Sequence, residues 1–282
     1  MTKPPHPLTQ LQRLAETTLH ITVTITTPAL THATGTVARL RAGDTDLIGK
    51  IHRTPALHQR EVHAYRTWTP HLGDAVPRLV AVAPELPGIV ITAVPGAPLD
   101  TLSLSAAEER EAHRAAGRIL RRLHALPNST PAEEIARYLA TRGEHWLSQL
   151  TSHLTRHDTD LVREHLHQLS SLTIARVAAC HLDFQPRNLL WHTDHQVRVI
   201  DFENSREDLA ARDLARLATR TWPHRPDLKT AFLDGYGPLD TTDTAVLHHV
   251  TALEAVTSLA YGLRTRDSHL VHIGQGLLAE LR

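Results

Sequence analysis

Apolar and polar residues alternate in the first third of the chain and recur at helical spacing in the rest. Alternation is typical of half-buried strands, and apolar residues three and four positions apart are typical of amphipathic helices. The pattern predicts a helix at residues 7–18, a second helix from Pro55 to about Trp68, and strands at 21–26, 36–41, 47–52, 78–83 and 88–94. The first 95 residues therefore indicate a five-stranded antiparallel sheet with one inserted helix.

Long helices dominate after residue 95. Ser105 and Glu108 form a capping box ahead of an apolar stripe, and Thr130-Pro131 with Glu133 predicts the next helix start in the same way. Further helices are expected at about 158–171, 208–222, 224–236, 241–263 and 266–281, and a β-rich interruption at 177–201. The fold class that follows is α+β, with strands first and helices afterwards.

Composition narrows the class of protein. The formal net charge is zero, which disfavours a nucleic-acid partner, because binding to phosphate backbones needs a clustered basic excess. The longest mainly apolar run, residues 88–99, holds two prolines and is too short to span a membrane. Cys180 is the single cysteine, and the polar N-terminus shows no signal peptide. We expect a cytoplasmic protein without membrane or nucleic-acid partners, as a monomer or dimer.

The β-rich interruption carries the candidate chemistry. A polar loop, HLDFQPRN from His181 to Asn188, separates two apolar strands, and Asp201 stands at the end of the following strand. Oxygen ligands from an Asn and an Asp suit magnesium, which takes its remaining ligands from water and phosphate. Asp183 is not needed for the metal and is available to accept a proton from a hydroxyl nucleophile.

The pattern H-x-D-x-x-x-x-N followed by I-D-F resembles the catalytic and metal loops of the protein-kinase-like superfamily. RRLHALP upstream and RDLARL downstream are similar to the aminoglycoside phosphotransferase and choline kinase branch, and the resemblance covers about residues 30–220. It implies a two-lobed protein-kinase-like fold, with a nucleotide-binding lobe at 1–95 and a catalytic and acceptor-binding lobe at 96–282. It also implies the roles of four residues: His181 as the loop histidine, Asp183 as the catalytic base, and Asn188 and Asp201 as magnesium ligands.

Lys50 is one of only three lysines in a chain that otherwise uses arginine, and it lies in a predicted strand. Glu61 falls on the same helix face as Leu57 and Tyr65, so its carboxylate points inward and needs a partner. Lys50 is the candidate partner, and the resemblance implies that Lys50 then binds the α- and β-phosphates of ATP or GTP. The alternative is that Glu61 is a solvated surface charge beside Arg60.

Asp213 poses the same question on the helix expected from about Asp208. It lies four residues after Leu209 on the inward face. A buried carboxylate there would accept backbone N–H bonds from the catalytic loop and fix its shape, as the resemblance also implies. The alternative is a surface ion pair with Arg216.

Other nucleotide contacts are assigned from the resemblance and from strand position. Thr34 and Gly35 occupy the place of the phosphate-binding loop, although the segment has one glycine where protein kinases have three. Ile48 shares a strand face with Lys50 and is expected to line the adenine pocket, unless it is an ordinary core residue. The Thr92 carbonyl and the Val94 amide are expected to bond the base, unless this is a plain strand end.

The distribution of charged residues along the chain bears on the acceptor. Residues 1–99 carry a net charge of +3 and residues 100–282 a net charge of −3. Glu203, Glu207 and Asp208 follow the metal loop directly, so we expect them beside the acceptor site, where carboxylates attract cations. This predicts a hydroxylated, amine-bearing acceptor, with aminoglycoside-like antibiotics ahead of amino alcohols, sugars and nucleosides. No aromatic cage for choline is visible among Trp146, Trp191, Trp222 and Tyr261.

Two functions other than that of a kinase are a non-catalytic pseudokinase and a metal-dependent hydrolase. A non-catalytic pseudokinase would keep the fold as a binding module, but it usually lacks the base or a metal ligand, and all of these are present. A metal-dependent hydrolase needs paired ligands such as H-E-x-x-H. His248 and His249 are adjacent and are expected on different faces of a helix, so they are not predicted to share a metal.

Overall fold

The computed structural model describes residues 7–26, 30–32 and 35–282, which form two compact units. The first unit extends to Leu123 and includes 186–206, and the second comprises 124–185 and 207–282. The boundary expected at residue 95 does not separate these units, because Ala97 pairs with Trp191 and so joins the segment 186–206 to the first unit. A functional division into lobes at residue 95 stays a prediction.

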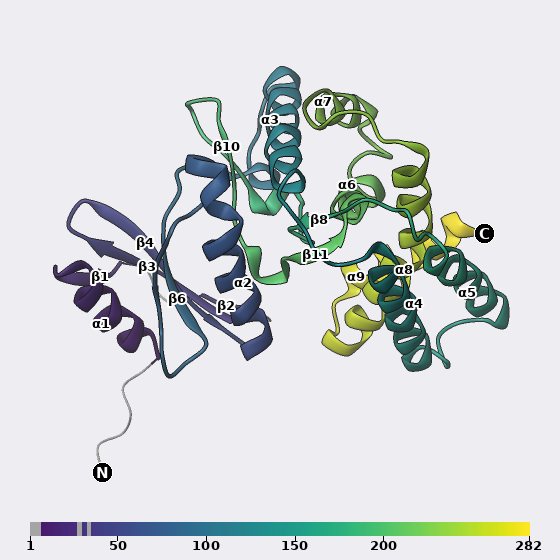
Figure 1. Cartoon of the computed structure of the whole chain (residues 1–282), viewed down its shortest axis with the longest axis horizontal. Coiled ribbons are helices and arrows are strands. Elements are labelled where there is room, and N and C mark those ends of the chain that lie inside the picture. Colours follow the sequence, from purple (N-terminus) through teal and green to yellow (C-terminus); the bar gives the residue numbers. More distant parts are fainter. Residues whose placement is uncertain (1–6, 27–29, 33–34) are drawn as a thin grey trace, which may run out of the picture. The chain divides into compact units, whose positions relative to one another are not determined.

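The first unit contains a sheet, its covering helices and a short hairpin (Figure 1). Its strands are β1 Val23–Ile25, β2 Leu30–His32, β3 Gly35–Ala42, β4 Thr45–His52, β5 Leu79–Val82, β6 Gly88–Thr92, β7 Ala97–Pro98, β9 Leu189–Trp191 and β10 Val197–Val199. Its helices are α1 Pro7–Leu19, α2 Pro55–Thr67 and α3 Ala106–His124, with 3-10 turns η1 Thr69–Ala75, η2 Leu99–Thr101, η3 Pro186–Asn188 and η4 Phe202–Asn204.

The main sheet is antiparallel and follows the order β1-β3-β4-β6-β5. The five strands expected from the sequence are confirmed, and the described residues add a short sixth strand, β2, which pairs with β3. Thr54 caps α2 by accepting a hydrogen bond from the Leu57 amide, with Pro55 in the first turn, as the sequence predicts.

Strand β4 explains why α1 and α2 cover different faces of the sheet. Successive side chains of a strand point to opposite faces. Leu47 and Ile51 join Leu11 of α1 in one hydrophobic cluster, whereas the Lys50 side chain reaches Glu61 of α2. The alternation that predicts the strand therefore also directs its one lysine away from the apolar cluster and toward α2.

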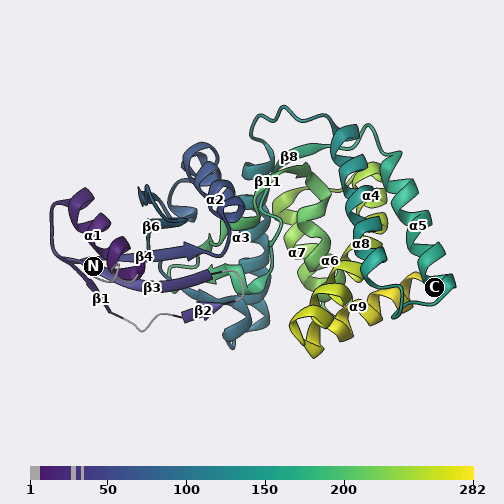
Figure 2. The same cartoon turned by 90° about the horizontal axis from the view of Figure 1, so that it is seen from below.

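The second unit is mainly helical. Its helices are α4 Ala132–Gln149, α5 Arg156–Ser170, α6 Ala215–Arg220, α7 Pro226–Tyr236, α8 Thr241–Thr265 and α9 Ser268–Leu281, and its remaining elements are β8 Val177–Cys180, β11 Arg206–Leu209 and the 3-10 turn η5 Ala210–Leu214. Helices α4, α5 and α8 run side by side and share one hydrophobic core with α9 (Figure 2). Gly274 lets α9 approach α8 closely, because a Cβ there would lie 2.7 Å from the Leu259 amide nitrogen.

Two local predictions were wrong. The helix expected at 208–222 is instead strand β11, the turn η5 and the short helix α6, because residues 206–209 pair with β8. The cap expected from Thr130 does not form either: α4 begins after Pro131 without a side-chain cap, and the Thr130 hydroxyl donates to Glu207. By contrast, the capping box of Ser105 and Glu108 is present at the start of α3.

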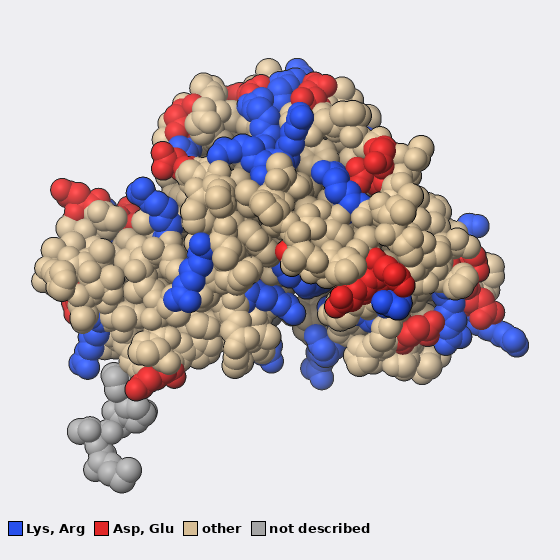
Figure 3. Space-filling model, in the orientation of Figure 1, with Lys and Arg blue, Asp and Glu red and all other residues tan. Residues whose placement is uncertain are grey.

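Surface charge is mixed rather than segregated. Figure 3 shows acidic and basic side chains interspersed over the face that it presents, with basic side chains gathered over α3. Among the described residues, no helix is both long enough and apolar enough to cross a membrane.

Candidate active site

The ammonium group of Lys50 is surrounded by three carboxylates within the first unit. Its Nζ lies 2.8 Å from Glu61 Oε2, 2.5 Å from Asp201 Oδ1 and 2.9 Å from Glu203 Oε2. Only 7% of Lys50 is exposed. Burial by itself lowers the pKa of Lys50, but the three carboxylates outweigh it and hold the pKa well above its usual value. The cluster therefore holds a charged lysine and an excess of negative charge.

Glu61 of α2 has two side-chain partners on strand β4. Besides Lys50, the His52 ring nitrogen Nε2 contacts the Glu61 carboxylate. Burial by itself raises the pKa of this carboxyl group. Lys50 and His52 outweigh that effect and lower the pKa to about 2. The predicted ion pair between Lys50 and Glu61 is confirmed, and the alternative of a solvated Glu61 is wrong, because this residue is fully buried. Contact of Lys50 with phosphate stays a prediction.

Asn188 and Asp201 stand at adjacent ends of the β9–β10 hairpin. The Ile200 amide donates to the Asn188 carbonyl oxygen at 3.1 Å, and Asp201 is the next residue. Asp201 adopts φ 71° and ψ 64°, a left-handed conformation that is uncommon outside glycine but tolerated by Asp. The predicted magnesium ligands are therefore neighbours, and both supply the hard oxygen donors that magnesium prefers.

The segment after Asp201 is anchored to α2. Phe202 is fully buried, and its ring centroid lies 5.7 Å from that of Tyr65. Aromatic pairs at this separation are favourable beyond the area that they bury. Helix α2 therefore contacts Lys50 through Glu61, and it contacts the segment after Asp201 through Tyr65.

The other predicted nucleotide contacts lie on the same sheet. Ile48 is half-buried on β4, on the face that carries Lys50, and Thr92 pairs with Leu47 at the end of β6. Val94 follows two residues later and is half-buried. Gly35 begins β3, where a Cβ would collide with the Ile51 carbonyl, so close strand packing already accounts for this glycine. Thr34 lies outside the described residues.

The loop that carries Asp183 is fixed by Asp213 in the second unit. The Asp213 carboxylate accepts hydrogen bonds from the amides of His181, at 2.7 Å, and of Leu182. Leu182 has φ 60°, a conformation that costs a non-glycine residue about 1–2 kcal/mol, so the loop needs this support. The predicted inward orientation of Asp213 is confirmed, and the alternative pairing with Arg216 is wrong because Arg216 contacts Asp183.

A buried polar network extends from Asp213 into the helices. His124 Nε2 lies 2.9 Å from Asp213 Oδ2, and its Nδ1 lies 2.7 Å from the Tyr236 hydroxyl. Arg176 donates to the same hydroxyl at 2.5 Å and to Asp243 at 3.3 Å. Burial raises the pKa of Asp213, but the hydrogen bond and charge of His124, with the His181 contacts, lower it overall. The loop that carries Asp183 is thus connected through Asp213 to His124, to Tyr236 of α7 and to Asp243 of α8.

Asp183 is almost fully buried at 2% exposure. Its Oδ1 accepts hydrogen bonds from Gln185 Nε2 and from the Arg216 guanidinium of α6. Phe184 anchors the next position, with its ring 5.9 Å from His181 and 6.2 Å from Phe232. A carboxylate whose Oδ1 atom has two donors is oriented before any acceptor binds, which is what a positioned proton acceptor requires.

The three acids expected at the acceptor site do not form an exposed cluster. Glu203 is buried against Lys50, and Asp208 is buried and paired with Arg212 at 2.6 Å. Burial, with Asp201 nearby, raises the pKa of Glu203 despite the opposing charge of Lys50. Glu207 accepts hydrogen bonds from the amides of Ser129 and Thr130 and so ties down that turn. Glu203 and Asp208 are thus buried and paired with Lys50 and Arg212, and a place for these acids beside the acceptor site stays a prediction.

Sequence reasoning missed several residues that hold the site. His124 lies within the segment RRLHALP and is buried. It follows Leu120 of the apolar stripe by four residues, and this helical spacing could have indicated that it points inward. His52 lies two residues after Lys50 on the same strand face, so strand periodicity could have found it. Nothing local in the sequence indicated that Arg216 contacts Asp183, because that contact depends on the fold.

The chain matches a phosphotransferase family over most of its length. A family model described as "Phosphotransferase enzyme family" matches residues 28–248, which is most of the chain. The chain belongs to this family and is a small-molecule phosphotransferase. No curated protein sequence matches it significantly.

Solved structures with the same fold cover nearly the whole chain. The macrolide 2'-phosphotransferase MphH from Brachybacterium faecium has a TM-score of 0.61 at 18% identity, over 96% of this chain and 98% of that one. The streptomycin-ATP ternary complex of APH(2'')-IIa has a TM-score of 0.67 at 13% identity, over 99% and 97%. A choline/ethanolamine kinase family protein from Mesorhizobium loti has a TM-score of 0.65 at 21% identity, over 91% and 87%. At these identities the likeness shows the shared fold alone.

Proposed function

We propose that the protein transfers the γ-phosphoryl group of ATP or GTP, with magnesium, to a hydroxyl group of a small amine-bearing molecule. The observation that carries this proposal is the contact of Lys50 Nζ with both Glu61 and Asp201, at 2.8 and 2.5 Å. Phosphoryl transfer depends on positioning and on electrostatic stabilisation of the transferred group. The two contacts support Lys50 as the phosphate ligand, oriented by Glu61 on one side and by the metal loop on the other.

The donor set fits magnesium. Asn188 and Asp201 would hold the ion, and their oxygens are the ligands that it prefers. The single ammonium group of Lys50 contacts three carboxylates, those of Glu61, Asp201 and Glu203. These four side chains carry more negative than positive charge. Bound magnesium would supply positive charge to the phosphate oxygens.

Asp183 is the proposed proton acceptor for the acceptor hydroxyl. Its carboxylate is buried on a loop whose strained backbone is fixed by Asp213, and Arg216 and Gln185 set its orientation. A positioned base of this kind contributes about 10²–10⁴-fold to the rate. His181 serves the loop rather than the substrate: its amide bonds Asp213, and its ring Nδ1 accepts from the Asp183 amide at 3.2 Å.

We propose an aminoglycoside-like antibiotic as the acceptor, ahead of amino alcohols, sugars and nucleosides, with resistance or self-protection as the role. The similar structures named for a macrolide and for streptomycin support an antibiotic acceptor. A choline-type cage is disfavoured at Trp146 and Tyr261, because the Arg264 guanidinium already lies 5.7 and 4.9 Å from their ring centroids. Glu203 and Asp208 are buried, so they do not offer exposed negative charge to an acceptor.

A coupled assay of nucleotide consumption tests this proposal across aminoglycosides, macrolides, amino alcohols, neutral sugars and nucleosides, with ATP and GTP in parallel. We expect magnesium-dependent turnover with at least one amine-bearing antibiotic and its loss in Asp183→Ala. Turnover confined to neutral sugars or nucleosides would overturn the proposed class of acceptor, but the assignment of the protein as a kinase would stand.

The metal role has a separate test. Calorimetric titration of the Asp201→Asn variant with magnesium and ATP should show loss of the magnesium-dependent part of nucleotide affinity. The exposed Asp160 provides the control substitution Asp160→Asn. Wild-type affinity in Asp201→Asn would remove the assignment of this residue as a metal ligand.

A further inference from the structure

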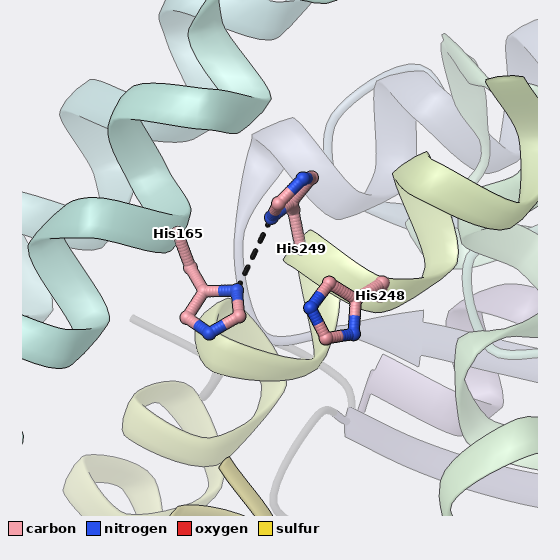
Figure 4. Close-up of side chains that lie close together, drawn as sticks. All are labelled: His165, His248 and His249. Carbon is pink, nitrogen blue, oxygen red and sulfur yellow. Dashed lines mark hydrogen bonds between the residues drawn. The ribbon is translucent and has the colours of Figure 1, made fainter. Parts of the chain in front are cut away.

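Three histidines of the second unit converge at a place that the catalytic residues do not use. His165 lies on α5, and His248 and His249 lie on α8. Figure 4 shows the three rings gathered between these two helices. One ring nitrogen of each histidine lies within 4.8 Å of the other two, and Nδ1 of His165 is 3.1 Å from Nδ1 of His249. The expectation that His248 and His249 point apart is therefore wrong.

The rings of the three histidines are in contact with one another. The ring centroids of His248 and His249 are 5.1 Å apart, and those of His165 and His248 are 4.9 Å apart. His165 is buried on the core side, His249 is half-buried, and His248 is exposed. The cluster is thus anchored on one side and open to solvent on the other, as a site that exchanges an ion with water must be.

We propose that His165, His248 and His249 form a binding site for a divalent transition-metal ion, zinc foremost, that links α5 to α8. Three imidazole nitrogens with one open position are a ligand set of zinc, and they also suit nickel, copper and cobalt. Magnesium prefers oxygen ligands, so this site is distinct in chemistry from the nucleotide site.

The distances suit tetrahedral coordination. Two nitrogens bound to zinc at tetrahedral angles are roughly 3.3 Å apart, given Zn–N bonds of about 2.0–2.1 Å. The 3.1 Å between His165 and His249 is close to this value. The exposed His248 ring can turn toward the pair without disturbing the core, so an ion can take the place of the hydrogen bond that joins His165 to His249.

The electrostatic surroundings of the cluster suit a cation. Glu164 of α5 faces it, and the negative charge of this residue attracts a positive ion. Burial and His248 lower the pKa of His165, and burial with His248 and His165 lowers the pKa of His249.

The test uses the full chain without an affinity tag, freed of metal with a chelator, and titrated with Co²⁺ and then Zn²⁺. We expect visible Co²⁺ absorption bands of tetrahedral intensity that saturate at one equivalent and are abolished by Zn²⁺. Zn²⁺ should also raise the melting temperature, because a ligand that binds only the folded state stabilises it. An excess of Mg²⁺ should change neither result.

The variants His248→Ala and His249→Ala decide whether these residues are the ligands. His248 is exposed, so its removal does not endanger folding. Each variant should bind Co²⁺ more than about 100-fold more weakly, since loss of a residue that merely supports a ligand already costs roughly 10–100-fold. The control is His157→Ala, an exposed histidine on the same helix α5, which should bind as the wild type does. Absence of saturable Co²⁺ binding, or equal binding in His248→Ala, would overturn the proposal.

Discussion

The ring of His124 donates a hydrogen bond to the Asp213 carboxylate at 2.9 Å, and both side chains are fully buried. Because Asp213 also accepts the amides of His181 and Leu182, this one contact joins His124 to the loop that carries Asp183. A buried network of this kind specifies a single loop conformation only while every member has its partner.

We therefore predict that His124→Phe lowers the free energy of unfolding by about 1–3 kcal/mol, the cost of a buried polar group that loses its partner. It should lower kcat more than it raises KM, since loop shape affects the base rather than acceptor binding. Urea denaturation and steady-state kinetics measure the two effects. The exposed His272→Ala provides the control, and equal stability of the two variants would contradict the structural role.

Lys50→Met is predicted to abolish turnover and to cost about 3–5 kcal/mol of stability, because it leaves buried carboxylates without their cation. The double variant Lys50→Met with Glu203→Gln should recover part of this stability, since one uncompensated charge is removed, but no activity. Urea denaturation with a turnover assay checks both statements. Recovery of activity in the double variant would show that Lys50 acts only by balancing charge.

Asp183→Ala is predicted to lower kcat by about 10²–10⁴-fold while nucleotide binding is preserved. Arg216→Ala should give a smaller loss, because the base remains but its orientation is no longer fixed. Arg216→Lys should fall between, since lysine keeps the charge without the planar fork. Turnover at saturating substrate and nucleotide titration test the series. A larger loss in Arg216→Ala than in Asp183→Ala would make Arg216 the principal residue.

Stability should fall in acid partly through Glu61. The pKa of this carboxyl group is about 2 in the folded protein, below its ordinary value of about 4.3, so its contribution is complete above about pH 5 and is lost as pH falls toward 2. The contribution amounts to about 3 kcal/mol. Glu61→Gln should flatten the loss between pH 5 and 3, measured by urea denaturation. The exposed Glu133→Gln should leave the slope unchanged.

Local sequence determined the elements and the residues that carry the chemistry. Alternation located the five main strands, and strand periodicity with helix periodicity directed Lys50 and Glu61 toward each other, as the 2.8 Å ion pair confirms. These predictions succeeded because each depends on side-chain direction within one element, which spacing along the chain fixes.

Tertiary structure alone decided which partners the charged residues take. A helix was expected from residue 208, but residues 206–209 form a strand, because β8 offers them backbone partners. Glu203 and Asp208 were expected to attract a cationic acceptor, yet they are buried with Lys50 and Arg212 as partners. Arg216 pairs with Asp183, and His165 meets His248 and His249, across gaps of many residues in the chain. A polar side chain has no fixed partner in sequence, since the energy of burying it depends on which opposite group the fold brings within reach.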